Sequence, residues 1–144
     1  MNKKGFTLVE LLAVIVVLAI LTGVAVPNVI STINNNKRRT FLLDAERMVA
    51  KAEYFLSSSR TDRNTLSTPN ASITYNLSRL NEKKEFTSDP DGGTYQDGSF
   101  VKITLSGGEY KYCIFLEGSK RKIGTSASCL DSSLLTGIDV VKDK

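Results

Sequence analysis

Apolar residues follow three successive patterns along this chain. An almost unbroken apolar run extends from residue 11 to residue 26, apolar residues then recur every three or four positions from residue 41 to residue 56, and after residue 99 they recur every second position. A period of about 3.6 residues is typical of a helix with one buried face, and a period of two is typical of a strand. The sequence therefore predicts an apolar helix, an amphipathic helix and a group of strands, in that order.

The first pattern is long enough to cross a membrane. A helix over residues 6–26 would measure about 30 Å, which is the thickness of the hydrocarbon core of a bilayer. A cleaved secretory signal is the alternative, because such signals end at small residues and Gly23 or Ala25 would serve. Glu10 at the start of the apolar run and the helical pattern beyond the run argue against that alternative. We expect a transmembrane or filament-core helix over residues 6–27.

Gly23 and Pro27 predict a bend near the end of the apolar helix. Proline lacks an amide donor and clashes with the preceding helical turn. Glycine in a helix interior costs about 1 kcal/mol relative to alanine. We expect the helix to kink, or to lose backbone hydrogen bonds, in the stretch between these two residues.

The second pattern predicts an amphipathic helix over residues 28–58. One broad apolar stripe is formed by Phe41, Ala45, Met48, Ala52 and Phe55, with Leu42, Val49 and Leu56 beside it. Charged residues occupy the other faces, and serines at 57–59 end the pattern. A continuous helix from residue 6 to residue 58 is far longer than the usual length of about 11 or 12 residues. Such length is typical of a membrane or filament protein.

Residues 59–98 form a polar connection that is rich in turn residues. The run from Asp89 to Gly93 favours a turn. A structureless loop of this length is uncommon in a compact domain. We therefore expect a short strand near residues 72–77 or a short helix near residues 78–85 inside the connection.

The third pattern, over residues 99–144, predicts antiparallel strands. Apolar residues alternate through 101–105 and 110–116, and the glycines at 107–108 mark a hairpin turn. A third strand is expected at about residues 122–124. A small sheet has one face to bury, and the helical stripe is the large apolar surface available to cover it. The predicted fold class is α+β, with a long N-terminal helix whose amphipathic second half packs on a small C-terminal antiparallel sheet.

The composition argues against an enzyme. The chain has no histidine, which is the commonest general base and metal ligand, and it contains no catalytic triad, phosphate-binding loop or dinucleotide fingerprint. We expect no catalytic residue and no cofactor. The net charge of +4 includes Lys3 and Lys4 and gives little support to nucleic-acid binding. The run Lys37, Arg38 and Arg39 is expected to be a solvated helix face, or to pair with acidic residues of a neighbouring molecule.

Asp89, Asp91 and Asp97 are weak candidates for a calcium site. Carboxylate oxygens are typical calcium ligands, but the spacing does not match an EF-hand loop. Aspartate is also common in turns, because its side chain bonds to nearby backbone. We therefore expect turn residues here, and no metal site.

Cys113 and Cys129 predict one disulfide. An even number of cysteines in an exported chain is typical of a disulfide, and two free buried thiols are the alternative. Zinc is not expected, because two thiolates without histidine supply half of a tetrahedral site. The bond would close a loop of about 15 residues, for which the chain-entropy model gives about 3 kcal/mol of stability.

Glu10 is the least expected residue of the chain, because it immediately precedes residues 11–21, which are all apolar. A carboxylate at the bilayer centre costs about 2.5–3.5 kcal/mol on insertion scales, and less near the interface. The nearby cations Lys3 and Lys4 precede Gly5 and would face the cytoplasmic headgroups. We therefore expect the partner of Glu10 to lie on another molecule.

The sequence around Glu10 resembles the class III signal of type IV pilins and of the related pseudopilins. The resemblance rests on KKGFTLVELL at residues 3–12, on the apolar run, and on Pro27 and Asn28 after it. It covers roughly the first thirty residues and is highly specific there. Beyond Asn28 the resemblance is one of organisation, with a long helix followed by a sheet.

The resemblance implies how the amino terminus is processed. In that family a membrane aspartyl peptidase cuts after the glycine, and the new amino-terminal phenylalanine is methylated. Residues 1–5 would then be a leader, the cut would fall between Gly5 and Phe6, and Phe6 would be N-methylated. Glu10 would meet the Phe6 ammonium of a neighbouring subunit, and residues 28–144 would form the soluble domain.

The function implied by the resemblance is that of a structural subunit of a type IV pilus-like filament. The subunit would be stored in the cytoplasmic membrane and then assembled, as a homopolymer, into a cell-surface filament, and the resemblance does not choose among twitching, adhesion, secretion and DNA uptake as the use of that filament. Implied partners are the prepilin peptidase, an assembly ATPase and its membrane platform protein. A pseudopilin of a type II secretion or competence system is the alternative within the family. A filament-tip adhesin or DNA-binding module is the alternative of another class.

Overall fold

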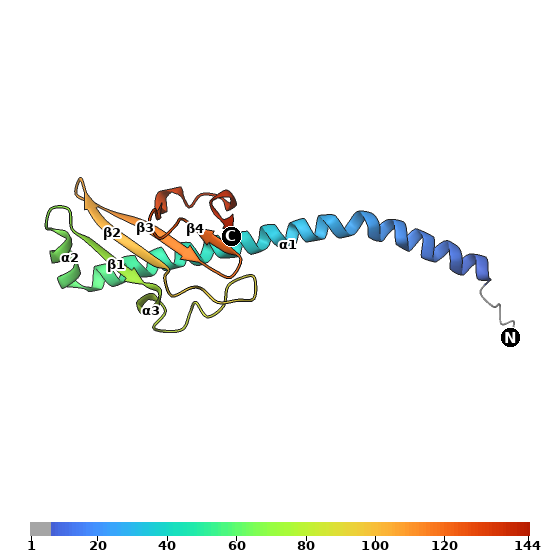
Figure 1. Ribbon diagram of the computed structural model, residues 1–144, viewed down its shortest axis with the longest axis horizontal. Helices are drawn as coiled ribbons and strands as arrows, with labels where there is room; N and C mark the ends of the chain where they lie inside the picture. The colour runs from blue at the N-terminus through green and yellow to red at the C-terminus, as the bar shows by residue number, and fades with distance from the viewer. Residues whose placement is uncertain (1–6) are drawn as a thin grey trace. The chain divides into compact units, whose positions relative to one another are not determined.

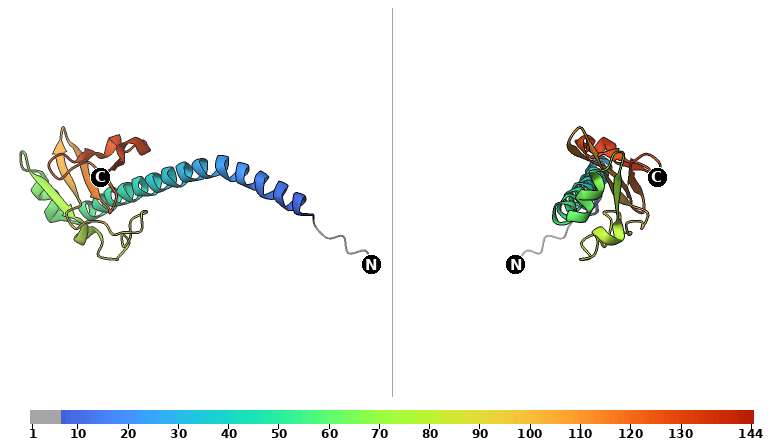
Figure 2. Two further views of the ribbon diagram at one scale, coloured as in Figure 1. Left: turned by 45° about the vertical axis from the view of Figure 1, so that its right-hand side comes forward. Right: turned by 90° about the vertical axis from the view of Figure 1, so that its left-hand side faces the viewer.

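The computed structural model describes residues 7–144, without the side chains at positions 24, 25 and 27. The chain divides into two compact units, one that ends at residue 36 and a globular one over residues 37–144 (Figures 1 and 2). The cleavage junction predicted at Gly5 and Phe6 lies outside the described residues.

Helix α1 contributes to both units and spans Leu8–Ser58, 51 residues in all. The long helix predicted from the first two patterns is therefore confirmed. The backbone is helical through residues 24–27, so the helix is not interrupted at the predicted bend. The kink assigned to Gly23 and Pro27 stays a prediction.

The globular unit contains an antiparallel sheet of six strands. Its strand order is β1-β2-β3-β4-β6, and β5 pairs with β3. The strands are β1 (Ser72–Asn76), β2 (Phe100–Ser106), β3 (Glu109–Glu117), β4 (Arg121–Ile123), β5 (Leu130–Asp131) and β6 (Lys142–Asp143). The second half of α1 packs on one face of this sheet (Figure 1). The predicted α+β fold class is confirmed.

The β2–β3 hairpin forms where the alternating pattern predicts it. Val101 lies opposite Ile114, and Ile103 lies opposite Tyr112. Gly107 and Gly108 connect the strands with φ of 64° and 84°, a conformation that glycine adopts without steric cost.

The apolar stripe of α1 forms one side of the core. Phe41, Ala45, Met48, Ala52 and Leu56 are buried, whereas Phe55 is half-buried. The stripe therefore ends on Leu56, one position later than the spacing predicted. The side chains that face it from the strands include Tyr75, Val101, Ile103, Ile114, Leu116 and Ile123.

The polar connection contains more structure than was predicted. Strand β1 confirms the strand expected near residues 72–77, and α3 is a single turn at Leu77–Leu80 where a longer helix had been considered. The Asn81 side chain donates to the Phe86 carbonyl and accepts from the Phe86 amide, which turns the chain away from the helix. Helix α2 (Arg60–Leu66) was missed, because its sequence has no apolar periodicity.

The C-terminal segment contains strand β5 and three further short elements, none of which the sequence predicted. These are the 3-10 turns η1 (Ser132–Leu134) and η2 (Ile138–Val140), and strand β6. Strand β6 pairs with β4, so the end of the chain returns to the edge of the sheet.

Cys113 and Cys129 form a disulfide with a Cα–Cα distance of 5.4 Å. Cys113 lies in β3, and Cys129 immediately precedes β5, which pairs with β3. The bond therefore fastens the C-terminal segment to the sheet.

Removing this disulfide is expected to destabilise the globular unit by about 3 kcal/mol, because the unfolded chain regains the entropy of an open loop. Denaturant unfolding of a Cys113→Ser, Cys129→Ser double variant measures the loss. Alkylation of the unfolded, unreduced wild-type protein provides the control, since both thiols should be protected there. Modification of both cysteines in exported protein would contradict the bond.

Candidate functional site

The first turn of α1 is closed by a reciprocal pair, Thr7 and Glu10. The Thr7 amide and the Thr7 hydroxyl both donate to Glu10 Oε2, each over 2.9 Å. The Glu10 amide donates in turn to the Thr7 hydroxyl over 3.3 Å. This arrangement is a capping box, in which a threonine before the helix and a glutamate three residues later satisfy amides that have no partner within the helix.

The capping box gives Glu10 hydrogen-bond partners within the chain, and its expected charge partner on another molecule stays a prediction. Thr7 supplies hydrogen bonds to the carboxylate within the chain, and the amino-terminal end of a helix also favours a negative charge. No cation among the described residues forms an ion pair with Glu10. The sequence itself carries the signal for this cap, because Thr7 and Glu10 form a Thr-x-x-Glu signature before an apolar run.

The amino-terminal part of α1 has an apolar surface that the rest of the described chain leaves uncovered. The large apolar side chains from Leu8 to Leu21 are all exposed, and Leu8 is exposed by 82%. An 18-residue window of the helix has a mean hydropathy of 2.8, and none of the window is buried. Long apolar surfaces of this kind occur where a protein meets lipid or another protein. By length and composition the helix can cross a membrane.

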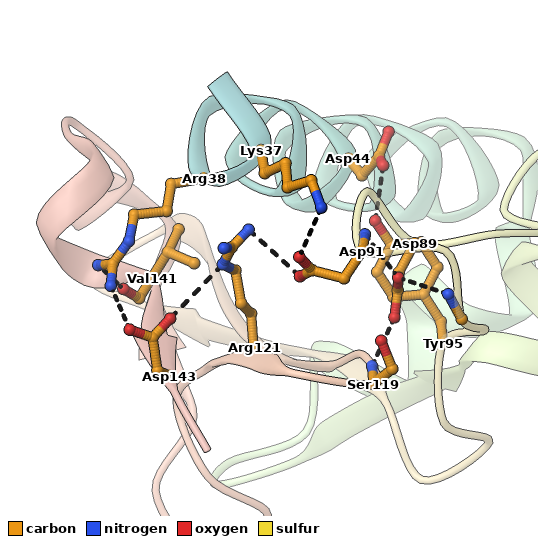
Figure 3. Close-up of polar contacts among 11 residues, drawn as sticks. Lys37, Arg38, Asp44, Asp89, Asp91, Tyr95, Ser119, Arg121, Val141 and Asp143 are labelled. Atoms are coloured by element: carbon orange, nitrogen blue, oxygen red, sulfur yellow. Dashed lines mark hydrogen bonds and ion pairs between the residues drawn. The ribbon is translucent and has the colours of Figure 1, made fainter. Parts of the chain in front are cut away.

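In the globular unit, a network of ion pairs fastens the connection between β1 and β2 to α1 and β4 (Figure 3). Lys37 Nζ lies 3.5 Å from Asp91 Oδ1, and Arg121 Nη1 lies 3.2 Å from Asp91 Oδ2. The Asp91 side chain is 3% exposed and that of Arg121 is 5% exposed. A carboxylate buried to this degree depends on its cations, because it has lost its hydration.

The same network holds the C-terminal strand against α1. Arg38 Nη1 donates to the Val141 carbonyl over 2.9 Å, and Arg38 Nη2 pairs with Asp143 (Figure 3). Arg121 Nε lies 3.5 Å from the other oxygen of Asp143. Two neighbouring residues of α1, Lys37 and Arg38, thus fasten two segments that are distant in sequence.

Asp89 closes the turn that carries Asp91. Its Oδ1 accepts the amides of Asp91 and Gly93 over 2.8 and 3.0 Å, and its Oδ2 accepts the Ser119 amide (Figure 3). Burial raises the pKa of the Asp89 carboxyl, but these hydrogen bonds outweigh burial, so the pKa lies below its ordinary value. Asp89 is therefore a buried, ionised cap of the loop.

Tyr95 links the loop to α1 through a second carboxylate. Its hydroxyl donates to Asp44 Oδ2 over 2.6 Å (Figure 3). Burial and then the Asp44 carboxylate raise the pKa of Tyr95, so the phenol stays protonated and acts as a donor. The Tyr95 ring also packs on Phe41, with 5.5 Å between ring centroids.

These contacts bear on two expectations from the sequence. At the weak calcium candidate, Asp89 accepts backbone amides of its turn, as expected of a turn residue, and Asp91 lies beside two cations. Asp97 is exposed, and the described residues contain no group of three side chains arranged to hold a metal. The run at 37–39 is not a wholly solvated face, since only Arg39 of the three is exposed.

Replacing Asp89 by asparagine is expected to cost about 1–3 kcal/mol at neutral pH, because one acceptor becomes a donor and a buried amide is left without a partner. The contribution of an acid with a lowered pKa is present above its unfolded pKa, about 3.9, and is lost as the pH falls through the folded value. The difference in Tm between wild type and Asp89→Asn should therefore shrink below about pH 4. A difference that does not change with pH would contradict an ionised cap.

Comparison with known proteins gives one family match. Residues 1–26 match the family model described as the prokaryotic N-terminal methylation motif. No curated protein and no solved structure matches the chain. The matched segment contains both the junction at Gly5 and Phe6 and the capping-box residues Thr7 and Glu10.

The motif indicates a type IV pilin-like or pseudopilin protein, a kind of protein that is generally structural. Such a signal implies processing by a prepilin peptidase and, in general terms, a pilus assembly machinery. It fits anchoring in the membrane before assembly, as does the exposed apolar helix. Residues 1–26 of this chain are therefore a class III prepilin signal, the amino-terminal signature of the type IV pilin and pseudopilin family.

Proposed function

We propose that this protein is the structural subunit of a type IV pilus-like filament. The observation that supports the proposal most strongly is the combination of the methylation motif with an apolar helix whose side chains are exposed throughout Leu8–Leu21. Lipid covers that surface before assembly, and the helices of other subunits cover it in the filament. The globular unit remains outside the bundle of helices and forms the filament surface.

Glu10 acts in this proposal as the residue that aligns neighbouring subunits. Cleavage after Gly5 creates an ammonium at Phe6, and the carboxylate of Glu10 pairs with that ammonium on the next subunit. The capping box supports this role, because the Thr7 amide and hydroxyl donate hydrogen bonds to one carboxylate oxygen of Glu10 before assembly, while the subunit is in the membrane. Only the carboxylate charge is left for the neighbour to compensate.

The proposed partners follow from the signal. A prepilin peptidase removes residues 1–5 and methylates Phe6, and an assembly ATPase acts through a membrane platform protein. The filament itself is a helical homopolymer at the cell surface. A pseudopilin of a type II secretion or competence system carries the same kind of signal, and a short structure within the envelope in place of a long surface fibre would favour that alternative.

Processing is the first test of the proposal. We expect the mature protein from its host to begin at Phe6 with an added methyl group, because the junction matches the class III signal. Intact mass and amino-terminal sequencing measure this directly. A mature chain that begins near Val26 would identify an ordinary secreted protein.

Electron microscopy of the host cells tests assembly independently of processing. Filaments at the cell surface that disappear when the gene is removed, and that consist mainly of this chain, are the expected result. Correct processing without any such filament would favour the pseudopilin alternative.

A further inference from the structure

The end of the chain, residues 137–144, folds back on the globular unit, and we call it the C-terminal strap. It consists of η2 and β6, and β6 returns to the outer edge of β4 (Figure 1). The chain before the strap is fixed, because Leu135 is buried and Cys129 is bonded to Cys113 of β3. The β4–β6 ladder pairs only two residues of each strand. The strap therefore depends on its side-chain contacts more than on its backbone pairing.

The apolar contact of the strap is small. Val141 is its one fully buried side chain, and Ile138 and Val140 are half-buried. The last three residues, 142–144, are exposed. Two backbone contacts flank Val141, since its carbonyl accepts from Arg38 over 2.9 Å and the Lys144 amide donates to the Lys120 carbonyl over 3.0 Å.

Ion pairs that are open to solvent fasten the end of the strap. Asp143 pairs with Arg38 of α1, and its other oxygen lies 3.5 Å from Arg121 Nε (Figure 3). Lys144 Nζ lies 2.7 Å from Glu117 Oε1 on β3. The Asp143 side chain is 58% exposed, and salt screens pairs between exposed charges far more than it screens buried pairs.

The contacts of the strap thus differ in kind from those that hold the sheet. The sheet is held by the apolar core on α1 and by the seven paired positions of the β2–β3 hairpin, which salt does not weaken. Segments with few buried apolar contacts open separately from the rest of a domain. We propose that the C-terminal strap opens as a unit while the sheet stays folded, and that ionic strength sets how often it opens.

Opening of the strap uncovers one edge of the sheet. Strand β4 lies between β3 and β6, so it becomes an edge strand when β6 leaves. Unpaired edge strands can pair with another chain, and charged residues on an edge discourage such pairing. In the closed state that edge is covered by β6, whose residues Lys142 and Asp143 are charged. The strap is therefore a salt-sensitive cover for β4, and this inference does not depend on filament assembly.

Hydrogen exchange measured by mass spectrometry, on the full-length protein in phospholipid nanodiscs, tests the proposal. Sodium chloride is raised from about 20 mM to about 500 mM, over which the Debye length falls from about 20 Å to about 4 Å. We expect the peptide that contains residues 137–144 to exchange about fivefold faster at the higher salt, because its ion pairs are screened. Peptides of the β2–β3 hairpin should exchange more slowly and keep their rate. A strap that exchanges as slowly as the hairpin, or that does not respond to salt, would overturn the proposal.

Matched variants locate the salt response. Asp143→Asn removes the charge that pairs with Arg38 and Arg121, so we expect its strap to exchange about threefold faster than wild type at low salt. Its response to salt should also be smaller, and the remainder comes from Lys144 and Glu117. Asp139→Asn is the control, because Asp139 is exposed on the same strap and forms no ion pair among the described residues.

The control variant should exchange at the wild-type rate and keep the wild-type response to salt. Unchanged exchange of the β2–β3 hairpin in both variants checks that the sheet remains folded. An Asp143→Asn strap that behaves as wild type would overturn the proposal. Equal acceleration by Asp139→Asn would do so as well, because the effect would then come from net charge and not from the ion pairs of Asp143.

Discussion

Replacing Glu10 by alanine is expected to stop filament assembly while leaving membrane insertion, cleavage after Gly5 and folding of the globular unit intact. If Glu10 pairs with the Phe6 ammonium of the next subunit, its loss leaves that charge unpaired in the filament core, at a cost of about 3–5 kcal/mol per subunit. Sheared-filament yield and the amount of protein in the membrane fraction measure the two effects separately. Normal filament yield from this variant would contradict the pairing.

Two further variants separate pairing from capping. Glu10→Gln keeps a side-chain oxygen that can accept from Thr7 but removes the charge, whereas Thr7→Val removes the hydroxyl and keeps the charge. Loss of a cap costs about 1 kcal/mol, which a filament with many subunit contacts tolerates. Pairing therefore predicts no filaments from Glu10→Gln and near-normal filaments from Thr7→Val. The reverse order of yields would assign Glu10 to capping alone.

The elements that could be predicted from the sequence are those whose signals are local. The stripe from Phe41 to Ala52 recurs at the helical period, and α1 buries that stripe. The alternation on both sides of Gly107 and Gly108 is likewise sufficient to place the β2–β3 hairpin. Hydrophobic periodicity works here because each element is long and buries one face.

The elements that were missed are short and are set by polar contacts. Helix α2 begins where the Ser59 side chain accepts a hydrogen bond from the Asp62 amide, and its sequence contains no apolar repeat that would predict a helix. Strand β5 is placed beside β3, where the disulfide of Cys129 lies. Strand β6 lies where Arg38 holds Asp143. Such contacts join residues far apart in sequence, and no local pattern encodes them.

The same distinction applies to the candidate sites. The capping box at Thr7 and Glu10 spans four residues and was readable from the sequence. The environment of Asp91 was not, because Lys37 lies on α1 and Arg121 lies on β4. An aspartate in a turn is usually solvated, or it binds a metal. Only the fold shows that Lys37 and Arg121 already pair with the two carboxylate oxygens of Asp91.

Replacing Arg121 by methionine is expected to destabilise the globular unit by about 3–5 kcal/mol, the usual cost of removing one member of a buried ion pair. Of the two cations beside Asp91, Lys37 would then remain, at 3.5 Å, and Lys37 is partly exposed whereas Arg121 is buried. Denaturant unfolding followed by circular dichroism measures the loss. Arg39→Met is the matched control, because Arg39 is exposed on the same unit, and we expect a change within about 0.5 kcal/mol there.

A double variant tests whether the loss comes from the pair itself. Asp91→Leu combined with Arg121→Met removes both buried charges, and replacing a buried ion pair by apolar residues is often nearly neutral. We therefore expect the double variant to be more stable than Arg121→Met alone, which means that the two substitutions are coupled. Losses that simply add would show that the two side chains act independently. In that case the turn would be fastened by Asp89 and its backbone hydrogen bonds, and the ion pairs would contribute little to holding it on α1.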